Sequence, residues 1–300
     1  MLPTFIVIGA QKAGTSSLWE YLNDHPEVFV TLDKEPKFFV KERAWGRGLP
    51  WYEGLFDKAG AAKARGEFST DYSCFPIYSG VPARMASLIP DVKLIYLMRN
   101  PLERMRSAYA YGLWAGSEAR PIEEALLVDS RYHIQSQYAL QIEQYAEYFP
   151  PSQMLFVTSE DLRQQRRETM SRIFSFIGVD PTFVPANLIE DFNTAQGRTR
   201  PRPWARLLGD AIIRTHLDEH MPPSVESVIG RIGNHALARS DISPTDVAVP
   251  DDLASSLVRY LRNDLESLRN WMGPSFDCWG LSESPDRSSP DQQQESPARA

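Results

Sequence analysis

Short apolar runs alternate with segments of helical period through most of the chain. The apolar runs end at glycine or at polar residues, and they lie at Thr4–Ile8, Glu27–Val30, Ala64–Phe68, Val92–Met98 and Met154–Thr158. Continuous apolar runs of this length are typical of strands that are buried on both faces of a parallel sheet. The pattern therefore predicts five strands of a mainly parallel sheet.

Apolar residues also recur at the three-to-four spacing of helices. The segments concerned are Ser16–Asn23, Pro82–Leu88, Leu102–Gly112, Ile122–Leu127, Ile134–Phe149, Leu162–Ile177 and Asp251–Trp271. The last of them carries a leucine stripe that begins at Leu253 and ends at Leu268. Because helices alternate with strands, we expect an α/β fold in which helices flank the central sheet.

The length of 300 residues suits one large domain. We expect a single domain over residues 1–280. Residues 281–300 are rich in Ser, Pro, Gln and Asp, and this composition predicts a disordered tail.

Composition and charge exclude several classes of protein. The net charge of −7 argues against a general nucleic-acid binder, which needs a broad cationic face. No apolar stretch approaches the ~20 residues that span a bilayer, and the start at Met1 lacks the cationic region of a signal peptide. Cys74 and Cys278 have no metal-ligand spacing around them. We therefore expect a cytoplasmic protein without a membrane span, a disulfide or a zinc site.

A glycine-rich turn follows the first apolar run. Residues 9–17 read Gly-Ala-Gln-Lys-Ala-Gly-Thr-Ser-Ser and lead into a predicted helix, an arrangement that binds anions through backbone N–H groups and the helix dipole. In a nucleoside-triphosphate P-loop, a lysine follows the second glycine. Here Thr15 has that position and Lys12 lies inside the turn. The segment favours a phosphorylated nucleotide without a γ-phosphate, with a turn that binds no ligand as the alternative.

A second candidate anion site follows the run Val92–Met98. Arg99 comes directly after this run, in the crevice where open α/β sheets bind ligands, and Ser107 follows two helical turns later. Asn100 is suited to be the N-cap of the next helix, with Glu103 reaching back as in a capping box. A planar guanidinium can donate two parallel hydrogen bonds to a phosphate, so we expect Arg99 and Ser107 to bind one.

Arg104 and Arg106 are interpreted differently, as solvated charges on the surface of the same helix. Two anion sites at the ends of two central strands imply a nucleoside that carries a phosphate at each end.

These motifs together resemble those of sulfotransferases that use 3′-phosphoadenosine 5′-phosphosulfate (PAPS). The segment 5–17 is similar to their 5′-phosphosulfate loop, and Arg99 with Ser107 to their 3′-phosphate motif. Residues 34–39, Lys-Glu-Pro-Lys-Phe-Phe, match the Lys-Glu-x-x-Phe-Phe segment of the carbohydrate branch, which includes the heparan sulfate sulfotransferases. The resemblance implies a P-loop NTPase-like three-layer fold and PAPS as cosubstrate, with no metal. It further implies transfer of the sulfuryl group to a hydroxyl of a glycan, glycolipid or small natural product.

The resemblance also implies roles for individual residues. Glu35 is expected to be the general base, shielded from water by Phe38 and Phe39, and Lys12 to stabilise the leaving phosphate. An ion pair of Glu35 with Lys34 or Lys37 is the alternative. The residues expected to bind PAPS are Gln11, Lys12, Ala13, Gly14, Thr15, Ser16, Ser17, Arg99, Ser107, Gly197 and Arg198.

One segment departs from the carbohydrate branch. The branch often reads Gly-Glu-Lys-Ser/Thr-Pro-x-Tyr, whereas residues 66–72 read Gly-Glu-Phe-Ser-Thr-Asp-Tyr. Phe68 thus stands in place of a lysine, and Lys37 is a candidate to compensate. The acceptor, O- or N-sulfation and the oligomeric state stay open. Two other functions also stay open, a P-loop nucleoside or small-molecule kinase and a non-catalytic nucleotide-binding module.

Overall fold

The computed structural model describes residues 1–188, 199–201, 239–241 and 247–281. Its central sheet has five strands in the order β2-β3-β1-β4-β5, and every neighbouring pair is parallel. The strands are β1 (Phe5–Gly9), β2 (Val28–Val30), β3 (Ala64–Phe68), β4 (Lys93–Met98) and β5 (Met154–Thr158). The predicted parallel sheet is confirmed, with each strand end within one residue of its predicted position.

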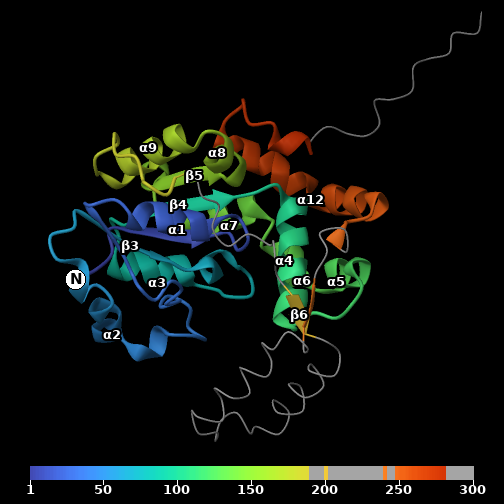
Figure 1. The fold of residues 1–300 in the computed structure, drawn as a ribbon, viewed down its shortest axis with the longest axis horizontal. Helices are drawn as coiled ribbons and strands as arrows, with labels where there is room; N and C mark the ends of the chain where they lie inside the picture. The colour runs from blue at the N-terminus through green and yellow to red at the C-terminus, as the bar shows by residue number, and fades with distance from the viewer. Residues whose placement is uncertain (189–198, 202–238, 242–246, 282–300) are drawn as a thin grey trace, which may run out of the picture.

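Helices surround this sheet (Figure 1). They are α1 (Thr15–Asn23), α2 (Leu49–Gly54), α3 (Val81–Leu88), α4 (Pro101–Ala115), α5 (Ile122–Val128), α6 (Ser130–Ile134), α7 (Tyr138–Ala146), α8 (Ser159–Gln164), α9 (Arg166–Ile177) and α12 (Asp251–Met272). In Figure 1, α4, α5 and α6 lie together to the right of the sheet, and α12 lies near α8 at the top. A small antiparallel sheet of β6 (Thr199–Pro201) and β7 (Arg239–Asp241) lies beside α4.

The core forms around the sheet because its central strands are apolar along their whole length. Every residue of β1 is buried, and so are the residues of β4 after Lys93. A second buried cluster joins the leucine stripe of α12 to side chains of α4 and α5. The predicted stripe is therefore confirmed as a buried face.

Two helices predicted as continuous are each divided in the structure. The segment 134–149 is divided between α6 and α7, because the carboxylate of Asp264 accepts hydrogen bonds from the backbone N–H groups of Ala139 and Leu140, at 3.2 and 2.9 Å. The segment 162–177 is divided between α8 and α9 at Gln165, whose φ of −126° is not helical. In both cases a new helix begins inside an uninterrupted apolar pattern.

The described part of the chain ends beside the sheet. A short 3-10 helix, Cys278–Gly280, follows α12. The indole N–H of Trp279 donates to Oε2 of Glu160 in α8 at 3.0 Å, and its ring lies 5.9 Å from that of Tyr138. Of the predicted tail, residues 282–300 lie outside the described residues.

Candidate active site

The loop between β1 and α1 has the backbone geometry of an anion site. A Cβ atom on Gly9 would lie 2.0 Å from Oγ of Ser73, so the loop can pack this closely only with glycine. Gly14 has a φ of +100° and is the N-cap of α1. Because glycine has no side chain, the N-cap supplies no acceptor to the first N–H groups of α1. The helix N-terminus thus lacks a side-chain cap, and the anion site predicted there stays a prediction.

Lys12 lies inside this loop with a φ of +70°. Its ammonium lies 4.3 Å from the centre of the Tyr111 ring in α4. Its carbonyl oxygen accepts a hydrogen bond from Nη1 of Arg99 at 3.3 Å. The two predicted anion sites are therefore in direct contact.

Arg99 follows β4, and its guanidinium is largely buried. The side chain is 18% exposed, and Nη2 lies 3.2 Å from Oε2 of Glu103. Burial lowers the pKa of Arg99, and the neighbouring guanidinium of Arg163 lowers it further. Its buried Nε has no hydrogen-bond partner among the described residues. A bound anion would offset both the burial and the repulsion.

The start of α4 confirms one part of the predicted cap and corrects the other. Oδ1 of Asn100 accepts from the N–H groups of Leu102 and Glu103, at 3.0 and 3.3 Å, so Asn100 is the N-cap. The capping-box role of Glu103 was wrong, because its carboxylate pairs with the guanidinium groups of Arg99 and Arg106. The N–H of Asn100 donates instead to Oε1 of Glu160, at 3.2 Å.

Arg104 also differs from its prediction as a solvated charge, since it is fully buried. Nε donates to Oγ of Ser136 at 2.6 Å, Nη1 to Oε1 of Gln135 at 3.3 Å, and Nη2 to the carbonyl oxygen of Tyr132. Several neutral acceptors between α4 and α7 thus enclose the charge. Arg106 on the same helix is 41% exposed, as expected of a surface charge.

Lys34 is a residue at this site to which the sequence assigned only the alternative ion pair with Glu35. Its ammonium donates to Oγ of Ser16 in the first turn of α1. Burial lowers the pKa of Lys34, whereas the charges of Glu35 and Glu20 raise it. A second ammonium therefore lies at the same helix N-terminus as Lys12. The sequence signal for Lys34 was its position directly before Glu35 in the Lys-Glu-x-x-Phe-Phe segment.

The other predicted PAPS-binding residues occupy the loop, α1 and α4. Gln11 contributes its carbonyl oxygen to a 3.5 Å contact with Nη1 of Arg104. Ala13 and Thr15 are buried, while Ser17 and Ser107 are partly exposed. Gly197 and Arg198 lie outside the described residues.

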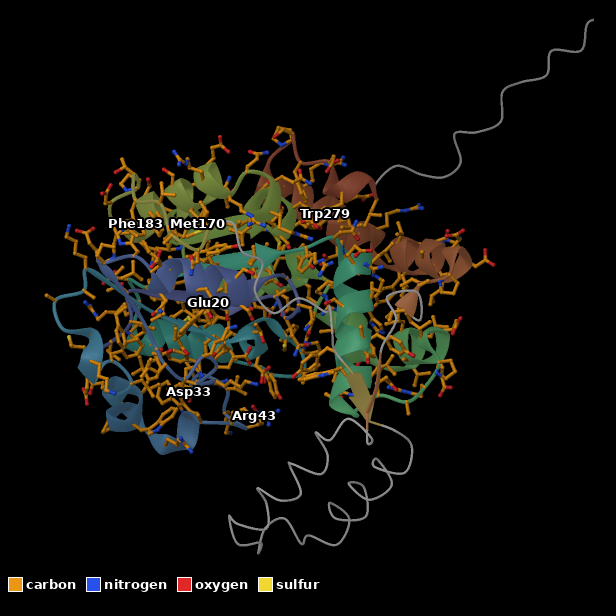
Figure 2. The ribbon with its side chains drawn as sticks, in the orientation of Figure 1. Glu20, Asp33, Arg43, Met170, Phe183 and Trp279 are labelled. Atoms are coloured by element: carbon orange, nitrogen blue, oxygen red, sulfur yellow. The ribbon has the colours of Figure 1, made fainter. Side chains whose placement is uncertain are left out.

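Glu35 belongs to a cluster of charges and hydroxyls after β2. Oγ1 of Thr70 donates to its Oε1 at 3.1 Å. The ammonium of Lys37 lies 3.2 Å from its Oε2 and 3.1 Å from Oδ2 of Asp71. The predicted pairing with Lys37 is thus present. Figure 2 labels Asp33 and Arg43, which precede and follow Glu35 and Lys37 in the chain.

Lys37 is held between two carboxylates. Burial by itself would lower its pKa, but the charges of Asp71 and Glu35 raise it above the ordinary value. Phe38 and Phe39 next to it are buried in the core, where the Phe38 ring stacks on Tyr52 at 4.1 Å. The side chain of Glu35 itself is 35% exposed, so any shielding by these rings is incomplete.

Two kinds of feature are absent from the described residues, a metal-binding cluster and a membrane-spanning helix. Within them, no group of three or more His, Cys, Asp or Glu side chains is placed to hold a metal ion. Among the helices described, none combines the length and the apolar character needed to cross a membrane.

Comparisons with known proteins agree on one family. The family model described as the sulfotransferase domain matches residues 2–202. Heparan sulfate glucosamine 3-O-sulfotransferase 6 of Mus musculus is 31% identical over 246 residues, which are 77% of this chain and 67% of that protein. Heparan sulfate glucosamine 3-O-sulfotransferase 3B1 of Homo sapiens is 31% identical over 231 residues, 72% of this chain and 57% of that protein.

A more distant relative and a solved structure extend this comparison. Bifunctional heparan sulfate N-deacetylase/N-sulfotransferase 4 of Mus musculus is 28% identical over 207 residues, 61% of this chain but 23% of that protein. The crystal structure of a sulfotransferase from Alicyclobacillus acidocaldarius is 22% identical with a TM-score of 0.68, over 93% of this chain and 99% of that one. This last likeness concerns the fold.

Proposed function

The chain belongs to the sulfotransferase domain family, and on this premise we propose that it transfers the sulfuryl group of PAPS to a hydroxyl group of an acceptor. The observation that carries the proposal is the hydrogen bond from Arg99 to the carbonyl oxygen of Lys12. It joins an anion site at the start of α1 to a second one at the end of β4. A nucleotide with phosphates at its 5′ and 3′ positions requires two such neighbouring sites.

The residues at both sites have the chemistry that PAPS needs. The first N–H groups of α1, with Ser16, Lys12 and Lys34 around them, would hold the 5′-phosphosulfate. The buried Nε of Arg99, which has no partner in the described part of the chain, would donate to the 3′-phosphate. Ser107 on α4 would donate to the same phosphate.

Gly197 and Arg198 remain proposed as further donors to the nucleotide. They directly precede β6 (Thr199–Pro201), whose backbone lies beside α4. The support is the contact of β6 with α4, the helix that also carries Ser107.

In the proposed reaction, Glu35 removes the proton of the acceptor hydroxyl while that oxygen attacks sulfur. The bond from sulfur to the bridging oxygen breaks, and its electron pair stays on the 5′-phosphate of the departing 3′-phosphoadenosine 5′-phosphate (PAP). Lys12 neutralises the charge that develops there. The hydroxyl of Thr70, 3.1 Å from Oε1 of Glu35, keeps the carboxylate in one orientation.

We propose a carbohydrate or another hydroxylated small molecule as the acceptor. The support is the similarity to proteins named as heparan sulfate sulfotransferases. Phe68 is 1% exposed, so the residue in place of the branch's lysine belongs to the core. The ammonium of Lys37, 3.2 Å from Glu35, is proposed to provide the missing positive charge.

A ligand-binding experiment tests this function against the alternatives. Thermal unfolding is measured with PAP, with ATP plus Mg²⁺, and without ligand. A ligand at ~100-fold excess over its Kd should stabilise the native state by ~2.7 kcal/mol. We expect PAP to stabilise the protein. Stabilisation by ATP with Mg²⁺ and not by PAP would contradict the proposal and favour a kinase.

Turnover is then tested with labelled PAPS and a panel of hydroxylated acceptors. Label transfer to at least one acceptor is expected for the sulfotransferase. Binding of PAP without transfer to any member of a broad panel would favour the non-catalytic module.

A further inference from the structure

A fully buried carboxylate lies outside the mechanism described above. Glu67 in β3 is 0% exposed, and three hydroxyl groups donate to it. Those of Tyr52 and Tyr72 donate to Oε1, at 2.7 and 2.8 Å, and that of Ser69 donates to Oε2 at 3.2 Å. Burial raises the pKa of this carboxyl to about 7, while the three hydroxyl groups counteract that rise.

Two of these hydroxyl groups also accept hydrogen bonds from the segment that carries Glu35. Oγ of Ser69 accepts from the N–H of Lys37 at 2.9 Å. The hydroxyl of Tyr72 accepts from the N–H of Phe39 at 3.3 Å. The carboxylate of Glu67 is thus connected to two backbone N–H groups. Ser69 links it to the N–H of Lys37, and Tyr72 links it to the N–H of Phe39.

The direction of these hydrogen bonds depends on the carboxylate. Above its pKa of about 7 the carboxyl of Glu67 is ionised and can only accept, so each hydroxyl then points its proton at Glu67 and offers a lone pair to the backbone. The backbone of Lys37 needs a hydrogen bond to another segment to keep its conformation, because its φ of +52° is unfavourable for a residue with a side chain. Both Glu35 and Lys37 depend on this backbone for their position.

We propose that Glu67 is a positioning residue for sulfuryl transfer. Through Ser69 and Tyr72 it fixes the backbone of Lys37 and Phe39, and thereby places the carboxylate of Glu35 and the ammonium of Lys37 at the acceptor. This inference rests on the proposed function, since it assigns Glu35 a reaction to perform. Glu67 itself contacts neither the acceptor nor the nucleotide.

The chain offers a matched control for this proposal. Tyr52 donates to the same oxygen of Glu67 as Tyr72 does, but in the described residues its hydroxyl makes no hydrogen bond to the backbone of residues 35–39. Tyr52→Phe and Tyr72→Phe therefore each remove one hydrogen bond to Oε1 of Glu67, and Tyr72→Phe alone also removes a connection to the Glu35 segment. Ser69→Ala cuts the other connection.

The first measurement is steady-state turnover of the full chain. We expect Ser69→Ala and Tyr72→Phe to lower kcat by about tenfold to a hundredfold, the effect of a misplaced catalytic group. The KM for PAPS and the thermal shift caused by PAP should stay unchanged, because neither residue belongs to the nucleotide site. Tyr52→Phe should keep kcat close to that of the unmodified protein. An equal loss of kcat in Tyr52→Phe, or full activity in the other two variants, would overturn the proposal.

The second measurement does not depend on activity. Amide hydrogen exchange at Lys37 should accelerate in Ser69→Ala, and that at Phe39 should accelerate in Tyr72→Phe, while Tyr52→Phe leaves both unchanged. Unaltered exchange in the first two variants would overturn the anchoring role even if PAP still binds. Absence of PAP binding in the unmodified protein would instead overturn the proposed function, so the two failures are distinguishable.

Discussion

Nη1 of Arg99 donates a hydrogen bond to the carbonyl oxygen of Lys12 over 3.3 Å. Arg99 follows β4 and Lys12 follows β1, and these two strands are neighbours in the sheet. Parallel neighbours end at the same edge, so residues that are far apart in sequence meet there. The contact brings the two proposed anion sites next to each other, as a nucleotide with 5′ and 3′ phosphates would require.

Arg99→Lys should weaken PAP binding more than binding of adenosine 5′-phosphate. The variant keeps the charge but loses the planar guanidinium, and a hydrogen bond to a charged group contributes about 1.5–3 kcal/mol, or about tenfold to a hundredfold in Kd. Calorimetric titration with both nucleotides measures the difference. The control is Arg106→Lys. Arg106 pairs with the same carboxylate of Glu103 but is more exposed, so this variant should change neither Kd. Equal losses of affinity for the two nucleotides would show that Arg99 does not bind the 3′-phosphate.

Glu35→Gln should abolish most turnover and leave PAP binding unchanged. An amide cannot take the proton of the acceptor, and loss of a general base lowers rates by about a hundredfold or more. Thermal stabilisation by PAP in the same variant shows whether the nucleotide site is intact. Unchanged kcat would refute the assignment of Glu35 as the base.

Arg104→Met should destabilise the fold. The substitution removes the donor to acceptors of Ser136, Gln135 and Tyr132; Ser136 is fully buried, and a buried unsatisfied group costs about 1–3 kcal/mol. We expect the free energy of unfolding in urea to fall by about 3 kcal/mol. Arg106→Met on the surface of α4 should change it by less than about 0.5 kcal/mol. Similar values for the two variants would contradict the buried role of Arg104.

The five strands could be predicted from the sequence because parallel strands buried on both faces are continuous apolar runs. The positions of the glycine-rich loop and of Arg99 could be predicted because they follow directly from the strand ends. Arg104 could not, since the groups that enclose it come from Gln135 and Ser136, 31 and 32 residues further along the chain. A guanidinium on a helix has the same local pattern whether it faces solvent or neutral acceptors.

The division between α6 and α7 could not be predicted from the sequence for a similar reason. The carboxylate that caps α7 belongs to Asp264, 124 residues after Leu140. The contact between Lys34 and Ser16 likewise depends on how the segment after β2 folds back over α1. Local periodicity contains no information about such partners.

Asp264→Ala should destabilise the protein through the start of α7. Removal of the carboxylate leaves the N–H groups of Ala139 and Leu140 without this acceptor, and loss of a helix cap costs about 0.5–2 kcal/mol. Amide exchange at these two residues should accelerate, together with a lower midpoint of urea unfolding. Exchange at the native rate would contradict the capping role.

Glu67→Gln should change how stability depends on pH. The pKa of Glu67 is about 7 in the folded protein, above the ordinary value of 4.5, so the native state binds this proton more tightly than the unfolded chain. The stabilising contribution is complete below pH 4.5 and disappears as the pH rises through about 7, a fall of about 3 kcal/mol. Urea unfolding of both proteins across this range isolates the contribution as the difference between the two curves. Parallel curves would contradict it.

The indole of Trp279 extends the donor site beyond the segment that the family model matches. Its N–H donates to one oxygen of Glu160, whose other oxygen accepts from the backbone of Asn100, the residue directly after Arg99. A deletion that begins after residue 202 would thus remove a support of Arg99, the residue proposed to bind the 3′-phosphate, as well as the leucine face of α12. The smallest fragment of this chain worth expressing for nucleotide-binding work therefore retains α12 and Trp279, whatever the limits of the matched domain.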